Sequence, residues 1–136
     1  MIFQLDYATV ITFVLISYLA TSLILFIAGT YIMQMYASSK KWDDSFSIPL
    51  KINIIWLIIT LAIGIPLLFF VGDTIFIDYM RVGINTIVGL ILVMRYYEKE
   101  WGESIQLVLV TQVILFIIAI LFGSIFGIVS LDILVN

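Results

Sequence analysis

Long apolar runs constrain this chain more than any other feature of its sequence. A helix needs roughly 20 predominantly apolar residues to cross the hydrocarbon core of a bilayer. Four stretches meet or approach that length, at about 8–35, 49–71, 75–97 and 105–131. Because a segment surrounded by lipid must satisfy its own backbone hydrogen bonds, each stretch is expected to be a helix. The sequence therefore predicts an all-α membrane protein, a bundle of four transmembrane helices.

The first and third stretches need separate arguments. A cleaved secretory signal has a basic start and a short apolar core, whereas residues 1–7 contain no Lys or Arg and the apolar run that follows is long. The first stretch is therefore expected to remain as a membrane span. The strictly apolar part of the third stretch, Val82 to Met94, is short. It must include residues 75–81 in order to cross.

Composition excludes several classes of protein. Of the 136 residues, 64% are hydrophobic and 11% are charged, which is too few charges to cover a soluble domain. The absence of Cys and His argues against disulfides, thiolate chemistry, His proton relays and most zinc, haem and iron–sulfur sites. No nucleophile–base pair stands out, so no enzymatic activity, cofactor or metal is expected. The net charge of −3 and the lack of a basic run argue against nucleic acid as a partner.

Two parts of the chain resemble each other at a constant offset. Trp42 and Trp101 are 59 positions apart, and the same offset relates several other scarce residues. These further pairs are Asp44 with Glu103, Ser45 with Ser104, Asn53 with Gln112 and Gly64 with Gly123. We interpret them as two tandem two-helix repeats, at about 8–71 and 75–131, within one membrane domain that covers residues 1–136.

Basic residues predict the orientation in the membrane, because Lys and Arg favour cytoplasmic loops. Most of them flank the first and third loops: Lys40, Lys41, Lys51, Arg95 and Lys99. Only Arg81 lies near the second loop. We therefore expect the first and third loops in the cytoplasm and both termini outside, in the cell membrane. The two repeats would then have parallel orientations, related by a pseudo-twofold axis along the membrane normal.

The repeated Trp–x–acid–Ser motif has two interpretations. It comprises Trp42, Asp44 and Ser45 in the first unit, and Trp101, Glu103 and Ser104 in the second. The functional interpretation is a cytoplasmic site for a cation, a lipid headgroup or a partner protein. The structural interpretation is that Trp anchors at the interface while the acids and serines cap a helix N-terminus. Capping and anchoring account for every residue type in the motif, so the structural interpretation is favoured.

Polar and small residues form a matched stripe on the second and fourth stretches. Asn53, Thr60 and Gly64 share one helix face, and Gln112, Ala119 and Gly123 repeat their spacing. Small residues let helices approach closely, and amides hydrogen-bond across helices in lipid. We expect these two helices to pack against each other, with a hydrogen bond between Asn53 and Gln112. The alternative is that these residues line a polar path.

Asp78 and Arg81 are three residues apart, on one face of the third predicted helix. An ion pair inside the membrane is a candidate functional site, because burying charge is costly. The alternative is an interfacial pair at the outer edge of the bilayer whose side chains reach the headgroups. The second interpretation is favoured at this stage.

These patterns leave three functions open, of which an intramembrane enzyme is the least favoured. The first is a non-catalytic scaffold or accessory subunit of a membrane assembly. Its partners would be the lipid bilayer and either further copies of the chain or another membrane protein. The second is a small oligomeric transporter or channel, in which Asn53, Gln112 and Asn85 would line a polar path.

Overall fold

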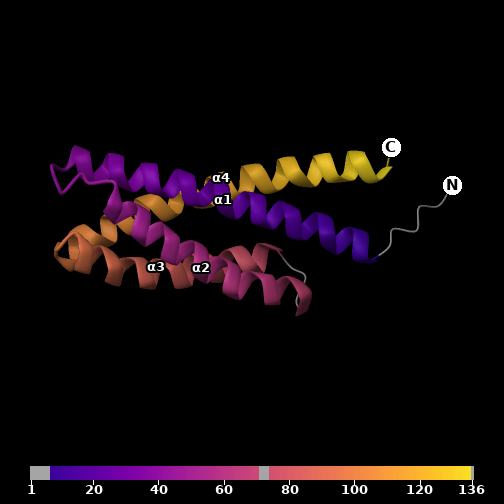
Figure 1. Cartoon of the computed structure of the whole chain (residues 1–136), viewed down its shortest axis with the longest axis horizontal. Helices are drawn as coiled ribbons and strands as arrows, with labels where there is room; N and C mark the ends of the chain where they lie inside the picture. Colours follow the sequence, from indigo (N-terminus) through magenta and orange to yellow (C-terminus); the bar gives the residue numbers. More distant parts are fainter. Residues whose placement is uncertain (1–6, 71–73, 136) are drawn as a thin grey trace.

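The chain folds into four antiparallel helices (Figure 1). The computed structural model describes the backbone of residues 7–70 and 74–135, without the side chains of 7, 74–75, 77–78, 127–131 and 133–135. The helices are α1 (Tyr7–Ser39), α2 (Ser47–Phe70), α3 (Thr74–Tyr96) and α4 (Trp101–Val135). The loops that join α1 to α2 and α3 to α4 lie at one end of the bundle, which we call the loop end. The start of α1 and the end of α4 lie at the other end.

Each helix packs against two others, in a closed ring. α1 contacts α2 and α4, and α3 also contacts α2 and α4. Within the described residues, α2 and α4 do not approach each other closely and stand on a diagonal of the bundle. The expectation that the two stripe-bearing helices pack directly together is therefore wrong. The α2 stripe faces inward and meets α1 and α3. On α4, Gln112 and Ala119 are buried but Gly123 is exposed.

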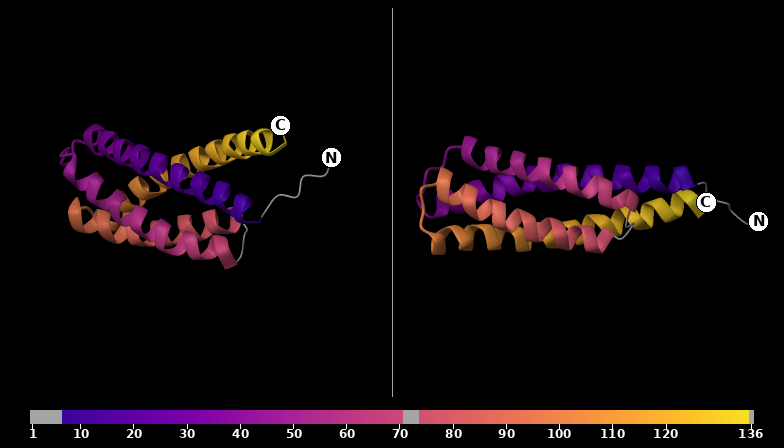
Figure 2. Two further views of the ribbon diagram at one scale, coloured as in Figure 1. Left: turned by 45° about the vertical axis from the view of Figure 1, so that its right-hand side comes forward. Right: turned by 90° about the horizontal axis from the view of Figure 1, so that it is seen from below.

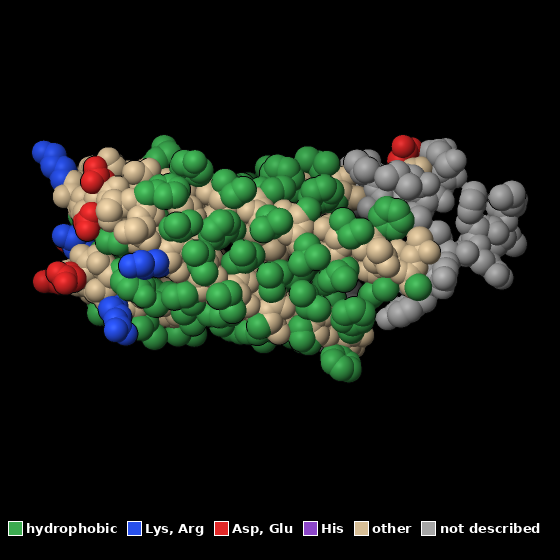
Figure 3. Space-filling model, in the orientation of Figure 1, with side chains coloured by type: hydrophobic (Ala, Val, Ile, Leu, Met, Phe, Trp, Pro, Cys, Tyr) green, Lys and Arg blue, Asp and Glu red, His purple; other side chains and the backbone are tan. Residues whose placement is uncertain are grey.

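Polar side chains are buried beside the apolar core of the bundle, and large apolar side chains are exposed on its surface. On α3 the buried positions are Arg81, Asn85, Gly89 and Val93, which follow each other at four-residue intervals on one face. The opposite face exposes Ile87 and Ile91. Hydrophobic side chains cover most of the surface, and charged ones gather at the loop end (Figure 3). This is the arrangement expected when the surrounding solvent is lipid and polar groups must find partners inside the protein.

Three of the helices are long and apolar enough to cross a membrane. They are Ala8–Ser39, Ser47–Phe70 and Trp101–Phe126, judged by length and composition over the described residues. The prediction of an all-helical fold with four helices is confirmed, and the three long apolar helices are compatible with an integral membrane protein. The predicted third span, α3, is not among the three, which were found over the described residues and so without part of the start of α3.

The outer parts of α1 and α4 extend beyond α2 and α3 (Figure 2). α1 has 33 residues and α4 has 35, against 24 and 23 for α2 and α3. At 1.5 Å per residue the excess is roughly 14–18 Å. Among the described side chains, none before Ser22 in α1 and none after Ala119 in α4 is buried. The closely packed part of the bundle therefore lies in its middle and at the loop end.

The structure does not confirm the internal repeat. Gly64 is buried on α2, whereas Gly123, its predicted counterpart on α4, is exposed with open space around it. α2 also continues as a helix through Pro66, and α4 has Ile125 at the corresponding position. The two helical hairpins thus differ most in their outer halves.

Candidate polar site in the bundle core

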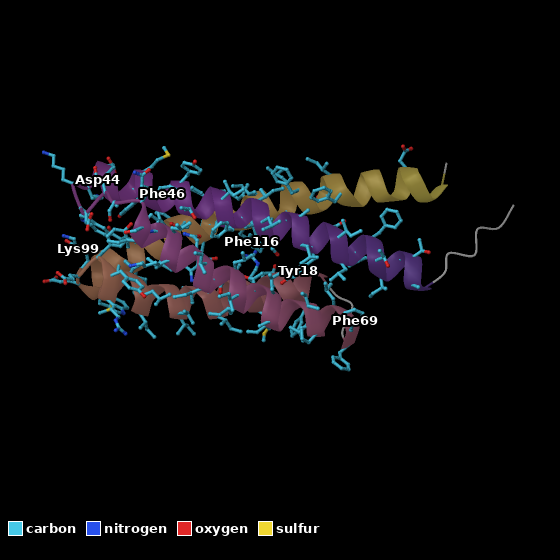
Figure 4. All side chains as sticks on the ribbon, viewed as in Figure 1. Tyr18, Asp44, Phe46, Phe69, Lys99 and Phe116 are labelled. Carbon is cyan, nitrogen blue, oxygen red and sulfur yellow. The ribbon has the colours of Figure 1, made fainter. Side chains whose placement is uncertain are left out.

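A hydrogen-bonded group of polar side chains joins three helices in the middle of the bundle. The Tyr18 hydroxyl on α1 donates to the backbone oxygen of Thr60 on α2 at 2.7 Å. The Asn85 side-chain amide on α3 donates to the Thr60 hydroxyl at 3.2 Å. Thr60 and Asn85 are both buried. Thr60 thus connects α1 to α3, which are not neighbours in the ring. Tyr18 points into the bundle at mid-length (Figure 4).

Asn53 lies next to this group, closer to the loop end of the bundle. Its amide donates to the backbone oxygen of Pro49 at 2.8 Å and contacts the Met33 sulfur at 3.5 Å. Asn53 is 2% exposed. The expected hydrogen bond to Gln112 is absent, because Asn53 satisfies its amide within α2 and against α1. The Gln112 side chain is buried on α4, and both its polar atoms lack a hydrogen-bond partner among the described residues.

A small cavity lies between these polar side chains. Its volume is about 20 Å³, and a cavity needs about 10–15 Å³ to hold one water molecule. Asn53, Thr60 and Asn85 line it, together with Ser22 and Arg81. The apolar part of the lining comes from Leu25, Phe26, Trp56, Leu57 and Leu115. Gln112 is not part of the lining, so the structure brings together two of the three residues predicted to line a polar path.

Arg81 is the residue whose position differs most from expectation. The favoured interpretation placed it at the membrane surface, but its side chain is only 5% exposed and lines the central cavity. It is the eighth residue of α3, roughly 10 Å from the outer end of that helix. A cation at this depth is expensive and marks a candidate functional site. The side chain of Asp78 lies outside the described residues, so the predicted Asp78–Arg81 ion pair stays a prediction.

Three glycines make room for large side chains of the neighbouring helices. A Cβ atom at Gly64 would collide with the Tyr18 ring, and one at Gly89 would collide with the Trp56 indole. A Cβ at Gly29 would collide with the Asn53 amide and lie 3.3 Å from Leu115. These contacts position Trp56 and Asn53, which line the cavity, and Tyr18, which donates a hydrogen bond to Thr60. Gly64 thus accommodates a ring of α1 and not a close approach of α4, and a Cβ at Gly123 would have nothing within 4 Å.

The first Trp–x–acid–Ser motif forms an aromatic cluster at the loop end. The Trp42 ring packs against Tyr36 and Tyr97, with ring centroids 5.6 and 5.5 Å away. The Lys99 ammonium lies 5.3 Å from the centre of the Trp42 ring, within the range of a cation–π interaction. Trp42 therefore joins the two loops. It does not stand alone as an interfacial anchor.

The acids and serines of the first motif act within the loop. The Asp43 carboxylate accepts a hydrogen bond from the Ser45 amide at 3.0 Å. The Ser45 and Ser47 hydroxyls are 3.5 Å apart. Asp44 is exposed, and its backbone oxygen accepts from the Gln34 side chain at 3.3 Å. These hydrogen bonds lie in the loop before Ser47, the first residue of α2, so the predicted capping of that helix stays a prediction.

The second motif has different surroundings. Trp101 is the first residue of α4 and is 60% exposed, whereas its counterpart Trp42 is half-buried in a loop. Ser104 is fully buried inside the first turn, where its hydroxyl donates to the Lys99 backbone oxygen at 3.4 Å. The Ser104 amide donates to the backbone oxygen of Glu100. Only Glu103, in the first turn of α4, lies where an acid complements the helix dipole.

Sequence reasoning missed Ser22 and Trp56, which line the cavity, and Tyr18, which hydrogen-bonds to Thr60. A signal was available for Trp56. Trp is enriched at the two interfaces of a membrane, and Trp56 stands in the middle of a predicted span. The same argument applies to Tyr18. Ser22 carries a weaker signal, because its hydroxyl donates to the backbone oxygen of Tyr18 within α1, as Ser commonly does in membrane helices.

Comparison with known proteins adds no relative: no family model, curated protein or solved structure matches this chain.

Proposed function

We propose that this protein is a non-catalytic scaffold or accessory subunit of a membrane assembly. The observation that carries the proposal is the uncovered outer part of α1 and α4. Those segments extend beyond α2 and α3, and their apolar side chains, such as Ile16, Leu121 and Ile125, are more than half exposed. A hydrocarbon core about 30 Å thick does not enclose straight helices of 33 and 35 residues. The exposed side chains of α1 and α4 beyond the ends of α2 and α3 are therefore available for contact with a helix of a partner.

The proposal includes an orientation and a location. The charged loop end lies in the cytoplasm, and the extended ends of α1 and α4 lie on the outer side of the cell membrane. The basic residues Lys40, Lys41, Lys51, Arg95 and Lys99 support this, since all of them lie at or near the loop end. We also retain the duplicated two-helix unit, with parallel orientation, as a proposal about the origin of the fold. The constant offset between Trp42 and Trp101 supports it.

The experiment is purification of the tagged full-length chain from its native membranes in a mild detergent, followed by mass spectrometry. We expect a stable partner, or a homo-oligomer, to accompany the chain. Leu121→Ala with Ile125→Ala should release that partner. The matched control is Ile87→Ala with Ile91→Ala, which removes equally exposed apolar side chains from α3. A monomer without companions, or equal loss of the partner in both variants, would contradict the proposal.

A second candidate function is transport, and the buried position of Arg81 favours it. Asn53, Asn85 and Arg81 surround a polar cavity in the middle of the bundle. A cavity of about 20 Å³ gives no continuous path, so transport requires the helices to move apart or a path between copies. Flux in proteoliposomes that disappears in Asn53→Leu with Asn85→Leu would support transport. If flux persists in this variant, the transport path does not run past Asn53 and Asn85.

A further inference from the structure

Two exposed basic side chains on neighbouring helices, Lys51 on α2 and Arg95 on α3, lie near the loop end of the bundle. We propose that this face of the bundle binds one anionic glycerophospholipid. Its phosphate contacts the two basic side chains, and its acyl chains lie along apolar side chains of α2 and α3. This α2–α3 lipid site is separate from the outer ends of α1 and α4, on which the assembly proposal rests.

Each basic residue is followed, towards the middle of the bundle, by exposed isoleucines on its own helix. The rows are Lys51, Ile54 and Ile58 on α2, and Arg95, Ile91 and Ile87 on α3. Intervals of three or four residues keep each row on one helix face. The isoleucines are between 40% and 65% exposed. Because α2 and α3 are antiparallel neighbours, both rows run in the same direction from the loop end, as the two chains of a lipid do.

The Lys51 side chain reaches towards α3. Its ammonium lies 5.8 Å from the centre of the Tyr96 ring, within the range of a cation–π interaction, and Tyr96 is adjacent to Arg95 in the sequence. Lys51 is the fifth residue of α2, and Arg95 is the last but one of α3. Both residues are therefore within roughly 6 Å of a helix end. Long basic side chains at such positions cover apolar surface with their stems and hold their charge at the level of the headgroups.

No acid pairs with these two basic groups within the described residues. The only polar contact of the Lys51 ammonium is the Tyr96 ring, and the Arg95 guanidinium has no hydrogen bond or ion pair. The sequence of α2 contains no Asp or Glu, and the only acid of α3, Asp78, is near the opposite end of that helix. The acids at the loop end, whose side chains are all described, lie in the loops or at the start of α4: Asp43, Asp44, Glu98, Glu100 and Glu103. A counter-charge for Lys51 and Arg95 therefore comes from outside the chain.

An anionic glycerophospholipid fits both parts of the site. The guanidinium of Arg95 can bind two phosphate oxygens at once, and the ammonium of Lys51 adds a second positive charge. A basic residue at a membrane surface raises the affinity for anionic lipid about fivefold. Phosphatidylcholine carries a quaternary ammonium beside its phosphate and has no net charge, so it gains less. A soluble phosphate lacks the acyl chains that the isoleucine rows contact.

Native mass spectrometry of the purified full-length protein in detergent tests the proposal. The protein is mixed with equal amounts of phosphatidylglycerol and phosphatidylcholine that carry the same acyl chains. We expect the adduct with one phosphatidylglycerol to predominate about fivefold or more. Glycerol 3-phosphate, which has the charged group without the chains, should give no adduct at the same concentration. Equal binding of the two lipids, or binding of glycerol 3-phosphate as strong as that of phosphatidylglycerol, would overturn the proposal.

Two matched pairs of substitutions locate the lipid. Lys51→Gln with Arg95→Gln should lower the apparent affinity for phosphatidylglycerol about 25-fold, or about fivefold for each charge. Lys40→Gln with Lys41→Gln removes the same charge from the loop end and should retain the affinity. The match is close, because the Lys40 ammonium also lies 5.8 Å from the centre of a tyrosine ring, that of Tyr36. Equal loss in both pairs would mean that the overall charge of the loop end attracts the lipid, and it would overturn the α2–α3 site.

The variants should fold, because all four substituted side chains are exposed. Their thermal unfolding midpoints in lipid-free detergent should match that of the wild type. If the pair at positions 51 and 95 does not fold, Arg95→Gln alone takes its place, with an expected loss of about fivefold. An unchanged affinity in Arg95→Gln would overturn the site. The comparison of the two lipids on the wild-type protein needs no variant.

Discussion

At Gly64 the α2 backbone lies directly against the Tyr18 ring, which in turn hydrogen-bonds to Thr60. Any larger residue must displace that ring, because even a Cβ atom would collide with it. We expect Gly64→Leu to reduce the free energy of unfolding by about 1–3 kcal/mol, the usual cost of overpacking a closed core. Gly123→Leu, at the corresponding position of α4, should change it little, since that position is open. Thermal unfolding of the two variants in detergent compares them. Equal destabilisation would contradict the close contact at Gly64.

Tyr97 gives a prediction about alkaline pH. Burial, and secondly the negative charge of Asp43, raise the pKa of its phenol from 10.0 to about 12. Between these values the unfolded chain has released the proton while the folded chain retains it. Stability should therefore fall as the pH rises from about 10 towards 12. Tyr97→Phe should show a shallower fall than the wild type in unfolding midpoints measured over this range. Parallel curves would mean that Tyr97 ionises equally in both states.

The arrangement of helices can be tested by disulfide formation, since the chain has no cysteine of its own. Gly29 on α1 lies next to Leu115 on α4. With Asn53→Ala to make room for the new Cβ, cysteines at positions 29 and 115 should form a disulfide within one chain under mild oxidation. Cysteines replacing Thr60 and Ala119 belong to the diagonal pair α2 and α4 and should not. Mass spectrometry after proteolysis shows which of the two cysteine pairs has formed a disulfide-linked peptide. A disulfide between positions 60 and 119 would mean that α2 and α4 pack directly against each other, and it would contradict the helix arrangement described above.

At the scale of the whole molecule, the orientation can be tested by labelling single cysteines with a membrane-impermeant thiol reagent in intact cells. A cysteine at Ser39 or Glu100 should be protected from the reagent by the membrane, because both positions lie at the proposed cytoplasmic end. Both are exposed, so burial in the protein would not explain the protection. A cysteine at Asp6 should be labelled. Ser104 is unsuitable for this purpose, because it is fully buried and would resist the reagent on either side. Labelling of a cysteine at Ser39 in intact cells would mean that the loop end lies outside, and it would contradict the proposed orientation.

The sequence by itself determined the helices of this protein and the identity of its inward faces. Apolar runs of membrane-spanning length leave the backbone no alternative to helix, and the scarce polar residues Asn53, Thr60, Asn85 and Gln112 do all become buried. Those results depend on local composition and on helical periodicity. They need no knowledge of which helix is next to which.

Only the tertiary structure decided which of those polar residues meet. The ring order separates Asn53 from Gln112, and Thr60 is joined to Tyr18 and Asn85 instead. It also decided that Arg81 is buried between helices, because the same spacing along α3 suits either a headgroup or a cavity. The constant offset in the sequence treats Gly64 and Gly123 as equivalent. In the structure only Gly64 has a neighbouring helix against it, since α4 continues past the bundle where α2 ends.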